Sequence, residues 1–203
     1  MTEQDYSVFD VVVVGSGAAG MVAALTAAHQ GLSTVVVEKA PHYGGSTARS
    51  GGGVWIPNNE VLQRDGVKDT AAEARKYLHA IIGDVVPAEK IDTYLDRSPE
   101  MLSFVLKNSP LKLCWVPNYS DYYPEAPGGR AHGRSCEPKP FDGNQLGDEL
   151  KNLEPDYTKA PMNLVVTQAD FKWLNLIMRH PKGIVRALRV GGRPQPAASA
   201  SRI

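Results

Sequence analysis

The chain has 203 residues, of which 42% are hydrophobic and 22% are charged, and its formal net charge is 0. This length suits one domain, or one domain with part of another. Balanced charge gives no reason to expect nucleic acid or an anionic membrane as a partner. No apolar run approaches the roughly 20 residues of a membrane-spanning helix.

The amino-terminal residues and the two cysteines indicate where the protein is located in the cell. The first residues are acidic and lack the basic start and apolar core of a signal peptide. Cys114 and Cys136 have no metal-binding spacing and suit free thiols in a reducing compartment. We therefore expect a cytoplasmic protein without a metal site.

The most informative stretch begins with four valines at residues 11–14, which predict a strand buried on both faces. Gly15, Gly17 and Gly20 follow it as G-x-G-x-x-G. In this fingerprint the first glycine allows a tight turn and the second lets the backbone approach a pyrophosphate. The third lets the next helix pack close to the strand.

The residues after these glycines complete a dinucleotide-binding pattern. A helix is predicted over 18–30, ended by Gly31, and a second apolar strand over 34–37. Glu38 follows this strand, near the spacing of about 20 residues expected for the carboxylate that binds a ribose hydroxyl. A carboxylate there disfavours a 2′-phosphate, and hence NADP. An ordinary glycine-rich turn without a nucleotide is the weaker alternative, because strand, helix and acid are all in place.

A second cluster of glycines and hydroxyl residues at 42–53 helps to decide between NAD and FAD, which both use this unit. Such a cluster is unusual for a plain NAD domain, and it offers backbone N–H groups and close approach to a large planar ligand. A flexible linker is the alternative reading. The apolar segment at 54–57, Val-Trp-Ile-Pro, argues against a linker.

The rest of the chain is predicted to be mainly helical, without an internal repeat. Thr70 and Glu73 form a capping box before the first of these helices, and Thr167 begins a further cap. The proline- and glycine-rich segment 118–139 is predicted to be irregular. The other predicted elements are helices at 71–82, 87–96, 98–107 and 168–179, and a half-buried strand at 111–115.

Three tyrosines lie close together in a proline-rich loop at 117–130: Tyr119, Tyr122 and Tyr123. Each offers an apolar ring and one hydroxyl, which together suit the wall of a site for a flat apolar substrate with a few oxygens. Packing of the loop is the simpler explanation for any one of them taken alone.

The segment 9–57 resembles the flavoprotein subunits of the fumarate reductase and succinate dehydrogenase superfamily. Three motifs are similar to those of the 3-ketosteroid 1-dehydrogenases: Ser-Gly-Gly-Gly-Val-Trp-Ile-Pro at 50–57, Ser-Asp-Tyr-Tyr-Pro at 120–124 and Gly-Arg-Ser-Cys-Glu-Pro-Lys-Pro-Phe at 133–141. The resemblance covers about residues 8–190. It implies an α/β fold: a Rossmann-like FAD-binding domain with an incomplete parallel sheet and helical and irregular additions.

The resemblance also implies the cofactor and its contacts. In succinate dehydrogenase flavoproteins a histidine carries FAD covalently, and Thr47 lies near that position here, so we expect non-covalent FAD. Tyr122 matches the tyrosine that hydrogen-bonds the catalytic base of the family, and we take it as the catalytic candidate. The cofactor-binding candidates are Gly15, Ser16, Gly17, Ala18, Ala19, Gly20, Glu38, Lys39, Gly45, Ser46, Thr47, Ser50, Gly51 and Gly52.

The activity implied is removal of hydrogens from carbons 1 and 2 of the A ring of a 3-ketosteroid. The resemblance leaves the preferred steroid, the electron acceptor, the oligomeric state and any partner polypeptide open. The family's base lies far downstream, beyond this chain. We therefore expect residues 1–190 to be the amino-terminal part of an FAD-binding domain with the start of a substrate-facing region.

Residues 191–203 are rich in Gly, Arg, Pro, Ala and Ser, and we expect a disordered tail. A frameshift near Val190 in a GC-rich gene would give the same composition, and sequencing the locus would test that hypothesis. On this view the chain is truncated and inactive. A non-catalytic dinucleotide-binding fragment and a small NAD-binding module remain the alternative functions.

Overall fold

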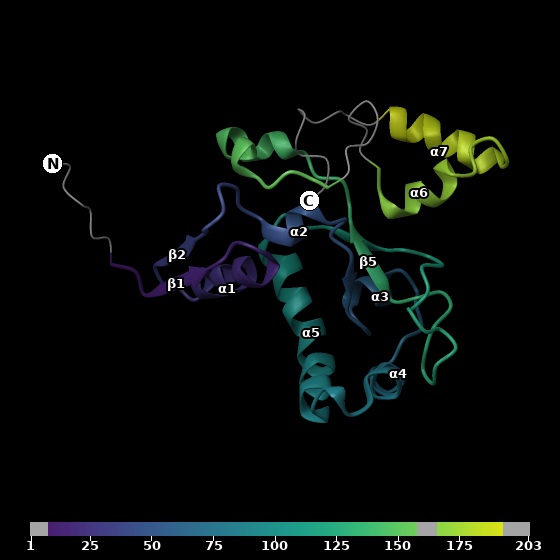
Figure 1. The fold of residues 1–203 in the computed structure, drawn as a ribbon, viewed down its shortest axis with the longest axis horizontal. Coiled ribbons are helices and arrows are strands. Elements are labelled where there is room, and N and C mark those ends of the chain that lie inside the picture. Colours follow the sequence, from purple (N-terminus) through teal and green to yellow (C-terminus); the bar gives the residue numbers. More distant parts are fainter. Residues whose placement is uncertain (1–7, 158–165, 193–203) are drawn as a thin grey trace.

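The computed structural model describes residues 8–157 and 166–192. A two-stranded parallel sheet with one helix lies at one end, a three-stranded antiparallel sheet lies in the middle, and a helical pair lies at the other end (Figure 1). The elements in chain order are β1 (Val11–Val14), α1 (Ala18–His29), β2 (Thr34–Val37), α2 (Gly45–Arg49), β3 (Val54–Trp55), α3 (Glu60–Arg64), α4 (Ala71–Ile82), the 3-10 helix η1 (Gly83–Val85), α5 (Ala88–Asn108), β4 (Leu113–Trp115), β5 (Ser135–Pro138), the 3-10 helix η2 (Gly143–Asn152), α6 (Gln168–Leu174) and α7 (Pro181–Gly191).

The strand–helix–strand unit predicted for the start of the chain is confirmed. β1 and β2 pair in parallel from Val11 opposite Thr34 to Val14 opposite Val37, and α1 is the crossover between them. A crossover of this kind between parallel strands is the building unit of doubly wound α/β folds. The described chain therefore has the α/β, Rossmann-like character that its sequence predicts.

The prediction that β1 is buried on both faces is wrong for this structure. Val13 faces α1, since its side chain would lie 3.4 Å from a Cβ placed on Gly20 of that helix. Val12 and Val14 point the other way and are 58% and 84% exposed. Among the described residues, the sheet consists of two strands covered by one helix, so only one of its faces is buried.

The antiparallel sheet has the order β3-β5-β4, and its central strand comes last in the chain. Segment 118–139 was predicted to be irregular, and β5 within it corrects that prediction. Cys136 pairs with Val54 of β3 on one side and with Trp115 of β4 on the other. Pairing on both sides stabilises a short strand whose composition gives no strand signal.

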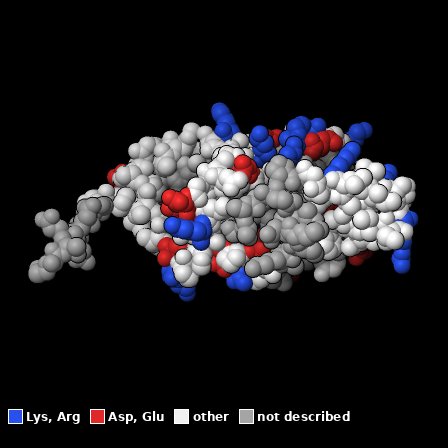
Figure 2. Space-filling view, turned by 90° about the horizontal axis from the view of Figure 1, so that it is seen from above, with Lys and Arg blue, Asp and Glu red and all other residues white. Residues whose placement is uncertain are grey.

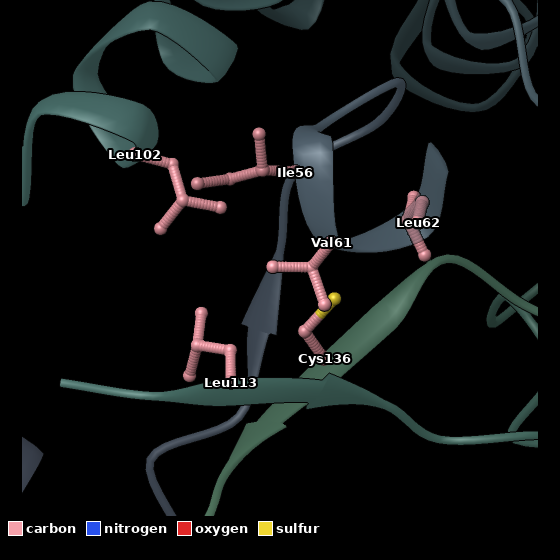
Figure 3. Packing of buried hydrophobic residues seen from close by; sticks show 6 residues of the cluster. All are labelled: Ile56, Val61, Leu62, Leu102, Leu113 and Cys136. Carbon is pink, nitrogen blue, oxygen red and sulfur yellow. The ribbon is translucent and has the colours of Figure 1, made fainter. Parts of the chain in front are cut away.

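The main hydrophobic core lies between this sheet, α3 and α5. Side chains from these elements point toward one another in Figure 3, and each of them is at most 3% exposed. The sulfur of Cys136 is part of this packing, and burial raises the pKa of its thiol to about 11. The cluster consists of Ile56, Val61, Leu62, Leu102, Leu113 and Cys136.

One continuous helix, α5, replaces the two helices predicted over 87–96 and 98–107. Pro99 lies inside it, although proline normally ends or kinks a helix. The buried side chains recur at helical spacing on both sides of Pro99, at Ile91, Leu95, Leu102 and Val105. Packing along this stripe therefore overrides the local signal of the proline.

One predicted helix cap is confirmed in full and one in part. The Thr70 hydroxyl accepts a hydrogen bond from the Glu73 N–H at the start of α4, but among the described residues the return bond from the Glu73 side chain that completes a capping box is not seen. α4 ends at Ile82, with Gly83 as its C-cap. Thr167 and Asp170 form a full capping box at the start of α6. The helix predicted over 168–179 is shorter in the structure: α6 ends at Leu174, with Asn175 as its C-cap.

The carboxyl-terminal part adds one helix that was not predicted, α7, which packs against α6. The Arg186 guanidinium of α7 forms an ion pair with Asp170 of α6, with Nε and Oδ1 2.6 Å apart. Of the tail predicted over 191–203, only the first two residues are described, and residues 193–203 lie outside the described chain.

Charged side chains of both signs lie close together along the edges of the face drawn in Figure 2. Among the coloured residues of that face, neither sign forms one continuous patch. In the described ranges, no helix combines the length and the apolar character needed to cross a membrane.

Candidate functional site

The turn between β1 and α1 has the geometry that the glycine fingerprint requires. Gly15 has a φ of +95°, in the region that favours glycine. A Cβ on Gly20 would lie 1.9 Å from the carbonyl oxygen of Gly15, so only glycine allows α1 to approach the turn this closely. A Cβ on Gly17 would meet nothing within 4 Å. The open side of this turn therefore lies at Gly17, at the amino-terminal end of α1.

Glu38 does not stand alone at the end of β2. Its carboxylate accepts hydrogen bonds from the Ser16 hydroxyl at 2.6 Å, from the Ser16 N–H at 3.0 Å and from the Ala40 N–H at 3.0 Å. These bonds, the Ser16 hydroxyl first among them, lower the pKa of Glu38 from 4.5 to about 2. The carboxylate is therefore held ionised against the glycine turn.

Ser16 also connects the glycine turn at 15–20, the first glycine segment, to the cluster at 42–53, the second glycine segment. While its hydroxyl donates to Glu38, its oxygen accepts a hydrogen bond from the Gly44 N–H at 2.9 Å. A Cβ on Gly45 would lie 3.5 Å from the Cα of Gly17, so the two backbones pass close to each other. Sequence reasoning placed both segments at a dinucleotide, and the structure brings them together directly.

Thr47 forms a further link between the two segments. Its hydroxyl oxygen lies 3.2 Å from the N–H of Ala18 in the first turn of α1. Ser46 and Thr47 are exposed on the short helix α2, Ala18 and Ala19 are exposed on α1, and Lys39 is exposed after β2. Of these predicted residues, Ala18 and Thr47 are joined directly, and all five are accessible from outside the protein.

The last predicted cofactor residues lead away from this turn toward the antiparallel sheet. The Ser50 hydroxyl donates to the Thr47 carbonyl at 2.9 Å and accepts from the Gly52 N–H at 3.0 Å. Gly52 has a φ of +65°, and a Cβ there would lie 2.8 Å from the ring of Pro138 in β5. Ser50 and Gly51 line a cleft of about 930 Å³.

The walls of this cleft come from five parts of the chain. Trp55 of β3 and Tyr77 of α4 form an aromatic wall, with ring centroids 5.9 Å apart. The loop at 117–130 that carries the three tyrosines, called the tyrosine loop below, supplies another wall. Tyr122 on this wall is 88% exposed. The remaining walls are mainly β5 with the residues after it and the amino-terminal end of α6 with the residues before it. Apolar surface with scattered hydroxyls suits a flat apolar ligand with a few oxygens.

Glu137 fixes α6 at the edge of this cleft. Its carboxylate is 4% exposed and accepts from the N–H groups of Gln168 and Ala169, at 2.6 and 3.2 Å. An ionised carboxylate at this end of a helix is favoured by the exposed N–H groups and by the helix dipole. Glu137 therefore attaches α6 to the central strand β5.

A buried charge cluster beneath the tyrosine loop was missed by sequence reasoning. Arg134 is 0% exposed and forms ion pairs with Asp69, at 2.9 Å, and with Asp121. Its guanidinium also donates to the Gly128 carbonyl at 2.9 Å. Asp121 and Arg134 both stand in the motifs that carry the resemblance, which is the signal that could have found them.

No group of three or more His, Cys, Asp or Glu side chains is arranged to hold a metal ion in the part of the chain that the structure describes. Both cysteines are free thiols, and they lie in the sheet rather than at the cleft or the glycine turn.

The site can be compared with known proteins. The sequence profile of a family described as FAD binding domain matches residues 10–193, nearly the whole chain. The chain belongs to this FAD-binding family. The paired glycine segments, with the open approach at Gly17 and the carboxylate at Glu38, fit the adenine dinucleotide part of that cofactor.

Two similar proteins are named as dehydrogenases of cyclic oxo compounds. The chain is 79% identical over 193 residues to a 3-oxosteroid 1-dehydrogenase of Mycolicibacterium smegmatis, which is 95% of this chain and 33% of that relative. It is 42% identical to a 4-oxocyclohex-2-ene-1-carboxylate 5-dehydrogenase of Sinomonas cyclohexanicum, over 72% of this chain and 24% of that relative.

A solved structure shares the fold. The 3-ketosteroid Δ1-dehydrogenase of Sterolibacterium denitrificans, crystallised with 1,4-androstadiene-3,17-dione, superposes with a TM-score of 0.82 at 39% sequence identity. The match covers 91% of this chain and 33% of that one. The chain thus spans about a third of the length of these relatives, and the resemblance predicted from its motifs is confirmed.

Proposed function

We propose that this FAD-binding chain supplies the dinucleotide site and one part of the substrate cleft of a 3-ketosteroid 1-dehydrogenase. The observation that carries the proposal is the continuity of the two regions. The second glycine segment contacts the first at Gly17 and then continues, through Ser50 and Gly51, into the wall of the cleft. A cofactor bound along this segment would reach a substrate lying against the tyrosine loop.

Several of the predicted residues then have a role in holding the cofactor non-covalently. The N–H groups at the start of α1 and the open side of Gly17 bind the pyrophosphate. Glu38 accepts a hydrogen bond from the ribose. Thr47, a hydroxyl residue, offers hydrogen bonds where a histidine would offer a covalent bond. When bound, FAD supplies the acceptor for the hydride that leaves the substrate.

In the cleft, the proposal gives Tyr122 the part that the resemblance implies. Its hydroxyl hydrogen-bonds the base that removes the proton from carbon 2, while hydride leaves carbon 1. A tyrosine base needs such support to reach a useful pKa. Because the resemblance implies a base outside this chain, we propose that residues 1–203 alone have no turnover. The two free thiols support a reducing, cytoplasmic location as part of the same proposal.

A chimera tests the proposal, with this chain replacing the corresponding third of the M. smegmatis relative. The expected protein is yellow, releases FAD on denaturation, and oxidises a 3-ketosteroid with an artificial electron acceptor. Tyr122→Phe should lower turnover and leave the flavin content unchanged. Equal loss of flavin and turnover would instead make Tyr122 a packing residue.

The isolated chain separates the alternatives. Weak flavin binding by residues 1–203 without turnover is expected for the dinucleotide-binding part of a dehydrogenase. Tight binding of NAD with no affinity for FAD would contradict the proposal and favour a small NAD-binding module. Steroid turnover by the isolated chain would overturn the view that the base lies elsewhere.

A further inference from the structure

Tyr122 is the most exposed of the three tyrosines in the loop, yet the residues on each side of it are held firmly. Asp121, directly before it, is 2% exposed. Tyr123, directly after it, donates its backbone N–H to the hydroxyl oxygen of Tyr77 at 3.2 Å. Two fixed neighbours set the direction in which the Tyr122 Cα–Cβ bond leaves the backbone, and this limits the positions that its exposed ring can reach.

Asp121, the residue before Tyr122, is held by three partners of its carboxylate: Trp55, Arg130 and Arg134. Oδ1 accepts from the indole N–H of Trp55 at 2.9 Å, and Oδ2 accepts from the Arg130 N–H at 3.1 Å. Oδ2 also pairs with the Arg134 guanidinium. The Asp121 N–H donates in turn to the Arg130 carbonyl at 3.0 Å. The same carboxylate thus joins the Trp55 wall of the cleft to the loop that carries Tyr122.

The Arg134 guanidinium holds that carboxylate in place from below. It lies 5.9 Å from the ring centroid of Trp55 and 5.7 Å from that of Tyr77, so it also packs under the aromatic wall. Its second carboxylate partner, Asp69, accepts the Asn58 N–H at 2.8 Å and is tied to the segment after β3. Burying these charges is costly, and the pairing of Arg134 with both carboxylates and with the Gly128 carbonyl offsets that cost.

We infer that Asp121 and Tyr77 are positioning residues, which set the direction of Tyr122 from its two sides, with Arg134 fixing Asp121. The inference rests on the proposed function only for its catalytic consequence. Asp121 and Tyr77 contact the backbone and side chains around Tyr122 and act through it. Loss of either contact lets Tyr122 sample more than one direction over the cleft.

The direct test places a fluorine label on Tyr122, as 3-fluorotyrosine, in the 203-residue chain at a concentration at which light scattering shows a monomer. We expect one narrow ¹⁹F resonance from the parent chain and a broadened or split resonance from Asp121→Asn and from Tyr77→Phe. Asp92→Asn is the matched control. It makes the same substitution in an ion pair with arginine, Arg75 at 2.8 Å, between α4 and α5 and away from the cleft. Its Tyr122 resonance should match the parent.

Tyr77→Phe keeps the test decisive if Asp121→Asn does not fold, because it removes one oxygen and no charge. A narrow, unshifted Tyr122 resonance in folded Tyr77→Phe would overturn the role of Tyr77, and the same result in folded Asp121→Asn would overturn that of Asp121. A broadened resonance in Asp92→Asn would also overturn the inference, since it would show a general loss of order.

Kinetics in the chimera separate this inference from the proposed function. Misplacing a reacting group by about 1 Å can cost on the order of 100-fold in rate, so we expect Asp121→Asn and Tyr77→Phe to lower kcat at least about tenfold with flavin content unchanged. If the ¹⁹F resonance broadens but kcat is unchanged, Tyr122 is positioned as inferred and the catalytic role proposed for it is wrong.

Discussion

Gly17 and Gly20 belong to one fingerprint, but they differ in what surrounds them. A Cβ on Gly20 would lie 1.9 Å from the Gly15 carbonyl oxygen, whereas a Cβ on Gly17 would meet nothing within 4 Å. Packing within the protein therefore requires glycine at position 20. Position 17 has room for a side chain, and the lack of one there matters only to a ligand.

We expect the same substitution to separate these roles. Gly20→Ser should lower the free energy of unfolding by about 1–3 kcal/mol, because the backbone must shift. Gly17→Ser should leave it unchanged or raise it by a few tenths of a kcal/mol, since serine is a good helix N-cap. Flavin affinity should nevertheless fall at least about tenfold, because the pyrophosphate approach is blocked. Urea unfolding measures the stability and flavin fluorescence titration measures the affinity. If the two substitutions changed stability and flavin affinity equally, the separate roles of Gly17 and Gly20 would be contradicted.

Glu38 gives a second expectation, in its dependence on pH. Its pKa is about 2 in the folded chain against 4.5 ordinarily. A carboxyl whose pKa is lower in the folded state stabilises that state above its unfolded pKa, and this contribution is lost as pH falls through the folded value. We therefore expect the parent to lose stability between about pH 4.5 and 2 more steeply than Glu38→Gln.

Ser16→Ala is the control for the cause of that shift. Removing the hydroxyl that donates to the carboxylate should raise the pKa of Glu38 and move the acid transition to higher pH. Thermal unfolding followed at a series of pH values would show it. Parallel curves for the parent and Glu38→Gln across this window would contradict the assignment.

Among the helices, α5 shows how packing overrides a local rule. Pro99 lacks the N–H for a bond to the preceding turn, and its ring crowds that turn, yet the helix continues to Asn108. We expect Pro99→Ala to stabilise the chain by about 1–2 kcal/mol, the helix gain exceeding the entropy that proline removes from the unfolded chain. Pro87→Ala, at the helix start, is the control, and should change stability by less than about 1 kcal/mol. A loss of stability in Pro99→Ala would show that the buried stripe needs a kink.

Local signals predicted the elements that depend on a few neighbouring residues. The glycine turn, the cap at Thr70 and the capping box at Thr167 are all written in short stretches of sequence. β5 and the Arg134 cluster depend instead on partners far away in the chain. Nothing in Ser-Cys-Glu-Pro indicates a strand until Val54 and Trp115 lie on either side of Cys136. Likewise, a lone arginine does not reveal that Asp69 and Asp121 will surround it.

At the scale of the molecule, the outer face of β1 and β2 is an exposed apolar surface of the described chain. Val12, Val14 and Val37 are 58%, 84% and 43% exposed there. An exposed apolar strand favours pairing with other chains. We expect the 203-residue chain to self-associate with rising concentration, and Val14→Thr, which keeps the side-chain shape, to reduce that association.

Val13→Thr is the control on the opposite face. It places a hydroxyl against α1, so it should lower stability and leave association no weaker than in the parent. Light scattering coupled to size-exclusion chromatography measures association, and urea unfolding measures stability. A monomeric parent at all concentrations would contradict the expectation.

The late position of β5 has a consequence for how the chain is made. Asn59 and Cys136, which contact each other in the core, are 77 residues apart in the sequence. At about 5–20 residues per second, a ribosome needs roughly 4–15 s to cross that interval. During this time β3, α3 and α5 have emerged with their apolar sides uncovered, and only the arrival of β5 closes them. We expect the nascent chain to bind chaperones until about residue 140 has emerged, and to release them once the central strand is in place.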